Sequence, residues 1–171
     1  MGPRPLVVVG DTLLDVDVDG DVERICPEAP VPVLDERARH IRPGGAGLAA
    51  ILAAGDGRAV TLVTALAGDE AGRELRSLLA AAGVEVVDLG LTGTTPRKTR
   101  LRADGRLVLR VDDGDAGAIR SPAPEPALRC VRSTGAVLVA DYGRGIAADG
   151  ALRRALTERP QGRPVIWDPH P

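Results

Sequence analysis

The chain has 171 residues, a length that predicts one domain with at most a small appendage. It carries 22 basic and 24 acidic residues, a formal charge of −2, and no long run of either sign that would attract nucleic acid or an anionic membrane. The apolar stretch at 6–9 is too short for a signal peptide core or a membrane span. These features exclude a nucleic-acid or membrane role and predict a cytoplasmic protein.

The thiols and imidazoles are too scattered for a metal site or a disulfide framework. Cys26 and Cys130 lie far apart without a CxxC spacing, and His40 and His170 are isolated. We therefore expect no zinc site, no other metal site and no disulfide framework, and interpret both thiols as buried or idle.

Apolar runs of the kind found in buried parallel strands alternate along the chain with helical patterns. Strands are expected at 6–9, 60–67, 84–89, 136–140 and 165–167. Helices are expected at 48–54 after a Gly44-Gly45 loop, from the N-cap Asp69 to Gly83, weakly in the proline-rich stretch 121–133, and at 148–158. This order predicts an α/β fold with a doubly wound, mostly parallel sheet.

Two segments depart from this alternation. Valine and aspartate alternate from Asp15, and the run 31–33 behaves similarly, as in half-exposed strands. Residues 99–111 have the pattern of a hairpin around an Asp104-Gly105 turn. We therefore expect a small antiparallel β flap, made from about 15–35 and 99–112, on a single domain that spans 1–171.

In doubly wound sheets, ligands bind beyond the carboxyl ends of the strands. Carboxylates follow several of the predicted strands, namely Asp11, Asp15, Asp69, Asp141 and Asp168. Turn or helix-capping chemistry is the alternative explanation and is strongest for Asp69. Gly44 and Gly45, at a helix N-terminus, could offer backbone N–H groups to a hydroxyl or an anion. No Walker A loop and no GxGxxG motif follows a strand, so a generic nucleotide-binding domain is the least favoured interpretation.

Several motifs together resemble, in order, the PfkB/ribokinase family of carbohydrate kinases. The resemblance is closest to the D-glycero-β-D-manno-heptose 7-phosphate kinases of ADP-heptose synthesis and covers essentially the whole chain. The motifs are Gly10–Asp15 (GDTLLD), Arg24–Val33 (RICPEAPVPV), Arg42–Ala46 (RPGGA), Lys98–Arg100 (KTR), Leu109–Asp112 (LRVD), Asp141–Gly145 (DYGRG) and Asp168-Pro169. The stretch through Pro27–Pro30 is much more specific than any glycine motif.

The resemblance implies a sugar bound between the rim of the sheet and a flap that acts as a lid and commonly as a dimer clasp. By the same resemblance, Asp15 binds sugar hydroxyls, Gly44 and Gly45 lie against the sugar, and Asp141 is a further sugar contact. Carboxylates suit polyols because each accepts hydrogen bonds from hydroxyl groups. ATP and Mg²⁺ are implied as the cofactors of the family.

Lys98 and Arg100 stand at alternate positions of the predicted flap, so both side chains point to one face. Lys98 is the single lysine among 22 basic residues. We interpret this face as a site for the phosphate of a sugar phosphate, with a solvated lid surface as the alternative.

The chain departs from the family in two ways. An asparagine normally follows the two glycines, whereas here Leu48 and Ala49 occupy those positions and the chain contains no asparagine. The family's C-terminal half, with its Gly-Ala-Gly-Asp anion hole and catalytic base, its Asn-x-x-Glu motif and its ATP site, has no counterpart here, and Asp168-Pro169-His170 stands where the family has Asp-Pro-Lys.

We therefore expect a truncated domain, the N-terminal sugar-binding portion of an ATP-dependent kinase, inactive alone. No residue is assigned a catalytic role, and neither ATP nor Mg²⁺ is expected to bind strongly. The alternative is a catalytically empty sugar-phosphate-binding or dimerisation module derived from such a kinase. Expected partners are a sugar or sugar phosphate, a second copy joined through the flap, or a missing C-terminal half.

Overall fold

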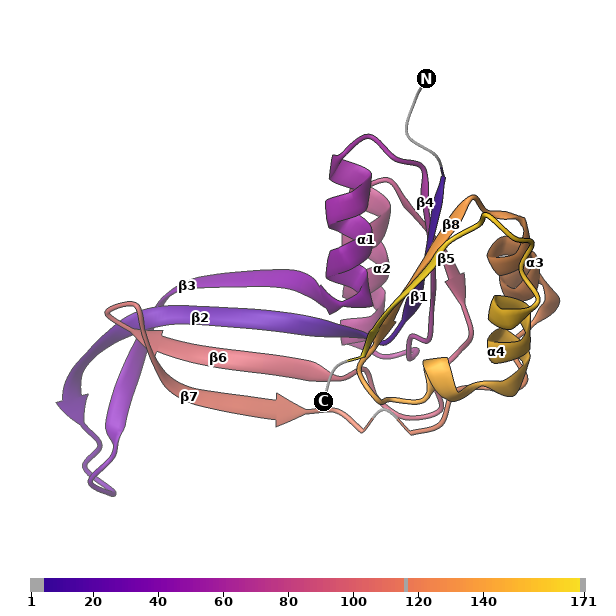
Figure 1. Ribbon diagram of the computed structural model, residues 1–171. Coiled ribbons are helices and arrows are strands. Elements are labelled where there is room, and N and C mark those ends of the chain that lie inside the picture. Colours follow the sequence, from indigo (N-terminus) through magenta and orange to yellow (C-terminus); the bar gives the residue numbers. More distant parts are fainter. Residues whose placement is uncertain (1–4, 116, 170–171) are drawn as a thin grey trace.

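A computed structural model describes residues 5–115 and 117–169; His170 therefore lies outside the described residues. The body is a parallel sheet with the strand order β5-β4-β1-β8-β9 (Figure 1). The bounds of these strands are β1 Leu6–Gly10, β4 Val60–Thr64, β5 Val84–Asp88, β8 Ala136–Asp141 and β9 Val165–Pro169. The predicted parallel α/β sheet is confirmed, with β1 at its centre.

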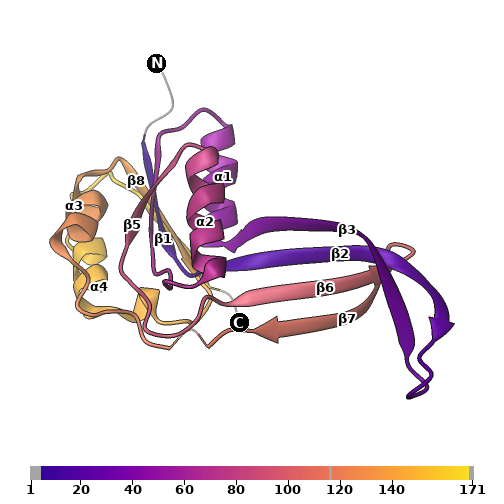
Figure 2. The same ribbon diagram turned by 180° about the vertical axis from the view of Figure 1, so that it is seen from behind.

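Helices cover both faces of this sheet (Figures 1 and 2). One face carries α1 (Ala46–Gly55) and α2 (Glu70–Ala81), and the other carries α3 (Glu125–Ser133) and α4 (Gly150–Thr157), with a short 3₁₀ turn, η1 (Ile146–Ala148), before α4. The side chains of β1 alternate between these layers: Val7 and Val9 join the core under α3 and α4, and Val8 the core under α1. This burial on both faces explains why β1 is continuously apolar.

The core is built from aliphatic side chains and close helix packing. Ala46 and Ala50 of α1 are fully buried against the sheet, and their small size lets the helix approach closely. No helix among the described residues is long and apolar enough to cross a membrane.

A second sheet forms the flap, which projects from the body on the side of α1 and α2 (Figures 1 and 2). Its order is β3-β2-β6-β7, from β2 (Thr12–Ile25), β3 (Pro32–Gly45), β6 (Arg97–Ala103) and β7 (Arg106–Asp113). The β2–β3 and β6–β7 pairs are antiparallel, and β2 and β6 run parallel between them. The structure thus confirms an additional, largely antiparallel sheet.

The flap is longer than the sequence pattern indicated. A single residue separates the end of β1 from the start of β2, and β3 continues through Gly44 and Gly45. The expectation of a glycine loop before the helix is therefore wrong, because both glycines end a strand and Gly45 serves as the N-cap of α1. Pairing with Leu13 and Thr12 of β2, which local periodicity does not reveal, extends this strand.

Candidate functional site

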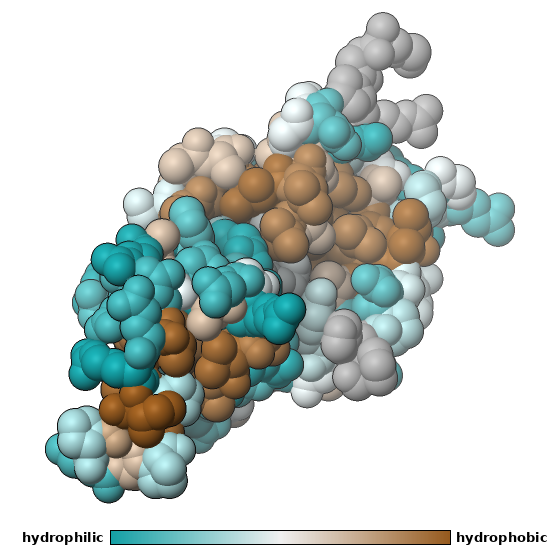
Figure 3. Space-filling model, turned by 90° about the vertical axis from the view of Figure 1, so that its left-hand side faces the viewer, coloured by the Kyte–Doolittle hydropathy of each residue, from teal (hydrophilic) through white to brown (hydrophobic). Residues whose placement is uncertain are grey.

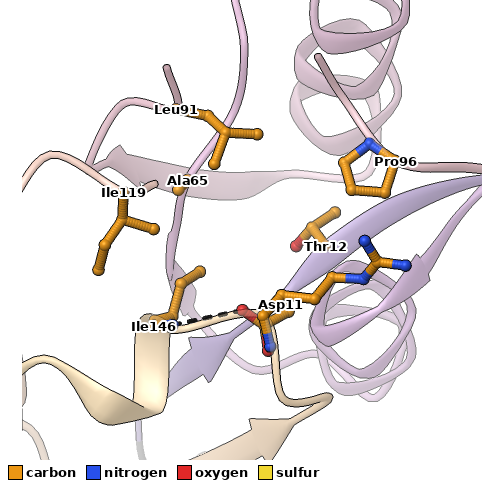
Figure 4. A pocket seen from close by; sticks show the side chains of 8 residues that line it. Asp11, Thr12, Ala65, Leu91, Pro96, Ile119 and Ile146 are labelled. Carbon is orange, nitrogen blue, oxygen red and sulfur yellow. Dashed lines mark hydrogen bonds between the residues drawn. The ribbon is translucent and has the colours of Figure 1, made fainter. Parts of the chain in front are cut away.

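The site lies where the chain passes from the body into the flap. β1 ends at Gly10 and β2 begins at Thr12, so Asp11 is the single residue between the two sheets. Its side chain is buried, and its carboxylate accepts backbone N–H bonds from Tyr142 (3.0 Å), Arg144 (3.1 Å) and Ile146 (3.4 Å). Figure 4 shows Asp11 and Ile146 joined in this way. Burial raises the pKa of Asp11 above its usual value, although these N–H donors oppose the shift.

The cavity around Asp11 is small. It measures about 10 Å³, room for about one water molecule, and Thr12, Ala65, Pro96 and Ile146 are among its lining residues (Figure 4). A sugar therefore does not fit inside it.

Gly45 lies directly against Asp11. It has a φ of +60°, and a Cβ atom placed on it would stand 2.4 Å from the backbone oxygen of Asp11. The same oxygen accepts the N–H of Ala46 at 3.0 Å. A glycine is thus required here both by the backbone conformation and by the space.

Asp15 of β2 is paired with Arg100 of β6. The Arg100 Nη1 atom donates to Asp15 Oδ1 at 2.7 Å, and the Asp15 residue is only 8% exposed. Gly44 leaves room for this carboxylate, since a Cβ there would lie 2.5 Å from Asp15 Oδ2. The structure thus brings three of the expected site residues into direct proximity.

Asp17 continues this polar face one step along β2. Arg42 donates to Asp17 Oδ2, while Asp17 Oδ1 accepts no hydrogen bond and lies 3.7 Å from Arg102 Nε and 3.9 Å from Arg100 Nη1. Burial acts to raise the pKa of Asp17, but the bond from Arg42 and the nearby guanidinium groups outweigh it and leave the pKa below its usual value. Asp17 is therefore held as an anion within an arginine network.

Lys98 stands between two acidic residues in the flap. It pairs in register with Asp15 on β2 and with Asp112 on β7. Arg110 donates to Asp112 at 2.7 Å. Among the described residues, no carboxylate lies within ion-pair distance of the Lys98 ammonium group, although its charge helps to lower the pKa of Asp112.

Asp141 lies at the end of β8, beside the end of β1. Its Oδ1 atom accepts the N–H of Gly143 at 3.0 Å. It follows Ala140, which pairs in register with Gly10. Its charge is among the smaller influences that raise the pKa of Asp11, whereas within the described part of the chain no hydrogen bond or ion pair joins it to Asp15 or Lys98.

Asp69 has a structural task, as the capping alternative predicted. Its carboxylate accepts Gly72 N–H at 2.8 Å, Thr95 N–H at 2.7 Å and Thr95 Oγ1 at 2.7 Å. These bonds tie α2 to the segment that enters β6. Asp69 therefore does not join a common cluster of carboxylates, whereas Asp168, in β9, pairs in register with Ala140, the residue before Asp141.

Sequence reasoning did not identify the bonds of Asp11 or the arginine network around Asp17. Arg42 alternates with the apolar Ile41, and in a strand this alternation places Arg42 on the polar face. The signal can be used only if β3 is recognised as extending to Gly45. The three backbone bonds of Asp11 leave no signal in the sequence, because they depend on the path of the loop after β8.

Among the described residues, no group of three or more histidine, cysteine, aspartate or glutamate side chains could hold a metal ion. The residues around Asp15 present carboxylate oxygens and guanidinium groups, which are chemically able to bond to hydroxyl and phosphate groups.

Residues 4–131 match the family model described as pfkB family carbohydrate kinase. This chain belongs to the pfkB family of carbohydrate kinases. It is 55% identical over 169 residues to the "Bifunctional protein HldE" of Streptomyces coelicolor. The aligned residues cover 98% of this chain and 34% of that protein. A protein of the same name from Nitrosococcus oceani is 38% identical over 96% of this chain and 35% of its own length. The chain thus spans about a third of the length of these curated relatives.

The fold resembles solved structures of sugar kinases. Phosphofructokinase-2 from Escherichia coli, in its tetrameric inhibited form, matches with a TM-score of 0.69 and 20% identity, covering 98% of this chain and 55% of that one. Arabidopsis thaliana ribokinase, solved with ribose and ATP, matches with a TM-score of 0.62 and 22% identity over 96% of this chain and 53% of its own. At these identities the likeness establishes the ribokinase-like fold.

Proposed function

We propose that this chain is the sugar-binding portion of an ATP-dependent carbohydrate kinase that acts on a heptose 7-phosphate. The observation that carries the proposal is the Asp15–Arg100 pair, which lies over Gly44 and beside the unpaired cation Lys98. Family membership and the relatives named HldE support the choice of a carbohydrate substrate.

Asp15 is the proposed ligand of the sugar hydroxyls. Its Oδ1 atom accepts the bond from Arg100, whereas its Oδ2 atom accepts no hydrogen bond from the described residues. The free oxygen can accept a hydroxyl proton. Arg100 then orients the carboxylate, and Asp141, with Oδ1 bonded to Gly143, offers its second oxygen from the other side of the rim.

Lys98 is the proposed ligand of the substrate phosphate. It lies next to Asp15 in the register of the flap, so a sugar held by Asp15 can place a phosphate near its ammonium group. Arg100 is already bonded to Asp15 and contributes to the phosphate site through its remaining N–H donors.

Phosphoryl transfer is proposed to need polypeptide beyond these residues. Kinases of this family use ATP and Mg²⁺, and transfer requires groups that take up the charge of the moving phosphoryl group. Because this chain spans about a third of the length of its curated relatives, we expect it alone to bind neither ATP nor Mg²⁺ strongly and to phosphorylate no sugar.

The outer edge of β9 is the proposed attachment point of a C-terminal half. β9 pairs with β8 on one side only among the described residues, and Ile166 is 63% exposed. Open strand edges with apolar side chains favour pairing with a further strand. The greater length of the relatives supports a following segment as that partner.

The flap is the proposed contact between two copies of the chain. Its face opposite Asp15 holds a hollow of about 410 Å³, lined by apolar residues of all four flap strands and of the turn before β3: Val22, Val31, Pro32, Leu34, Leu101, Val108 and Leu109. Figure 3, in which the flap faces the viewer, shows hydrophobic side chains on its surface between hydrophilic ones. Contiguous exposed apolar surface of this kind marks an interaction site.

A second candidate function is a dimerisation module that binds no sugar. The observation that favours it is the apolar Leu48, which stands on α1 where the family holds its sugar with asparagine. Calorimetric titration with a sugar phosphate distinguishes the sugar-binding function from the dimerisation module, because a dimerisation module that binds no sugar gives no binding heat.

The proposed phosphate site is tested by charge reversal. Calorimetry compares heptose 7-phosphate with the free heptose for the wild type, for Lys98→Glu and for Arg106→Glu, the last reversing an exposed charge at the flap turn. We expect the preference for the phosphorylated sugar to disappear only in Lys98→Glu. An unchanged preference in that variant contradicts the assignment.

A further inference from the structure

The loop after β8 is held by one carboxylate. Residues 142–145 form no helix or strand, and Gly143 and Gly145 have φ values of +71° and +107°. The N–H groups of Tyr142 and Arg144 both donate to Asp11 Oδ2, and that of Ile146 donates to Asp11 Oδ1. Alternate amides of the loop therefore converge on a single side chain.

The backbone of Asp11 holds two further segments. Its N–H donates to the oxygen of Ala140 at 3.3 Å, and its oxygen accepts the N–H of Ala46 at 3.0 Å. Gly45 packs so closely on this oxygen that no Cβ fits. Asp11 thus connects the end of β8, the start of α1 and the first residues of β2.

These three segments carry the residues assigned to the sugar. Asp141 precedes the loop, Gly44 and Gly45 precede α1, and Asp15 lies on β2. Tyr142 links two of them directly, since its Cε2 atom lies 3.5 Å from the position of a Cβ on Gly45. The loop also holds the Asp141 carboxylate, because the N–H of Gly143 donates to Asp141 Oδ1, so a displacement of the loop would move this carboxylate relative to Gly45.

We propose that Asp11 is a positioning residue that fixes the 142–145 loop against Gly45 and so sets the spacing of the sugar contacts. This inference rests on the proposed function for its link to sugar, and on the geometry around Asp11 for the link to the loop. Asp11 acts through the backbone N–H groups that its carboxylate binds, and it touches no substrate.

A carboxylate suits this task better than an amide. Two carboxylate oxygens accept all three N–H bonds, whereas asparagine has one acceptor oxygen and turns an NH₂ group toward the remaining donors. Asp11→Asn therefore keeps the shape of the side chain and removes at least one bond to the loop.

Asp149 provides a matched control. It is buried, and its carboxylate accepts backbone N–H groups from Ala151 and Leu152 at the start of α4 and from Ala123 just before α3. None of these donors belongs to the 142–145 loop. Asp149→Asn therefore removes the same kind of bond and lowers stability without removing a bond to that loop.

The experiment combines amide hydrogen exchange by NMR with calorimetric titration of the 171-residue chain by heptose 7-phosphate. In Asp11→Asn, we expect the amides of Tyr142, Arg144 and Ile146 to exchange about tenfold faster and the affinity for the sugar phosphate to fall by about tenfold. In Asp149→Asn, loop exchange and affinity stay at the wild-type values. Tyr142 is the only tyrosine, so its ring resonances report the same loop movement independently.

Loop amides that exchange in Asp11→Asn as in the wild type, or faster in both variants alike, overturn the proposal. If Asp11→Asn does not fold, hydrogen exchange of the wild type tests the proposal instead. We then expect the amides of Tyr142 and Arg144, after correction for intrinsic rates, to exchange more slowly than the amide of Gly145. Equal corrected rates overturn the proposal. Absence of sugar-phosphate binding by the wild type contradicts the proposed function, while the exchange data still decide the role of Asp11.

Discussion

Two carboxylates of one short stretch, Asp11 and Asp15, perform different tasks because their partners differ. Backbone N–H groups occupy both oxygens of Asp11, so this residue fixes a loop. A single guanidinium group occupies one oxygen of Asp15, so the other oxygen stays available to a ligand. At the residue scale, the number of free acceptor atoms separates a positioning residue from a binding residue.

Gly44→Ala tests the space around Asp15. The new Cβ would stand 2.5 Å from Asp15 Oδ2 and 2.7 Å from Leu13 Cδ1, so the carboxylate must move away from its place over the flap. We expect affinity for heptose 7-phosphate to fall at least about tenfold. Calorimetry is the measurement.

Gly68→Ala is the control for this substitution, because nothing lies within 4 Å of the position of its Cβ. We expect this variant to bind like the wild type. Full affinity in Gly44→Ala would show that the position of Asp15 does not determine binding.

At the scale of the element, α2 joins the body to the flap. Asp69 caps its first turn and also holds Thr95, two residues before β6 begins. Leu75 is fully buried and packs with Leu14, Val16 and Val18 of β2. The helix therefore anchors the flap both through a polar cap and through an apolar face.

Asp69→Ala should lower the free energy of unfolding by roughly 1–2 kcal/mol at neutral pH, as expected for the loss of an N-cap. Burial raises the pKa of Asp69, but the bonds from Thr95 and Gly72 outweigh it and leave the pKa below the unfolded value of 3.8. The stabilisation that the ionised Asp69 provides is thus present above pH 3.8 and is lost as the pH falls through the pKa of Asp69 in the folded protein. Urea unfolding at several pH values measures the difference.

The difference in stability between the wild type and Asp69→Ala should therefore narrow in acid. Thr95→Val, which removes only the hydroxyl donor, should cost less than Asp69→Ala at neutral pH. A difference that stays constant down to the lowest pH at which the protein folds contradicts this description of the cap.

The elements with a strong local pattern could be predicted from the sequence. β1, α2 and the Asp104-Gly105 turn were found because a buried apolar run, an N-cap with helical spacing and a two-residue turn are each local signals. β3 was not followed to Gly45, because its last residues are defined by pairing with β2. The same limit applies to the site: the proximity of Asp15 and Arg100 depends on a parallel pairing of strands 85 residues apart.

At the scale of the whole molecule, the flap has two unlike faces. One holds the charged residues around Asp15 and Asp17, and the other holds apolar side chains such as Leu101 and Leu109. Leu109 is 52% exposed. An apolar face that projects into solvent is stabilised when a second copy covers it.

Leu109→Arg should therefore shift the chain toward the monomer, with self-association weakened by about tenfold or more. Sedimentation velocity over a range of protein concentrations measures this shift. Leu52→Arg is the control, since Leu52 is 63% exposed on α1 and lies outside the flap. A wild type that remains monomeric at all concentrations contradicts the flap contact.

The most direct test of the central claim is an NMR titration of the ¹⁵N-labelled chain with heptose 7-phosphate and, separately, with ATP and Mg²⁺. We expect saturable shifts with the sugar phosphate, confined to the amides around Asp15, Gly44, Gly45, Lys98 and Asp141, and no saturable shifts with the nucleotide. Saturable binding of ATP at micromolar concentration, or sugar-phosphate shifts that leave these residues unaffected, would contradict it.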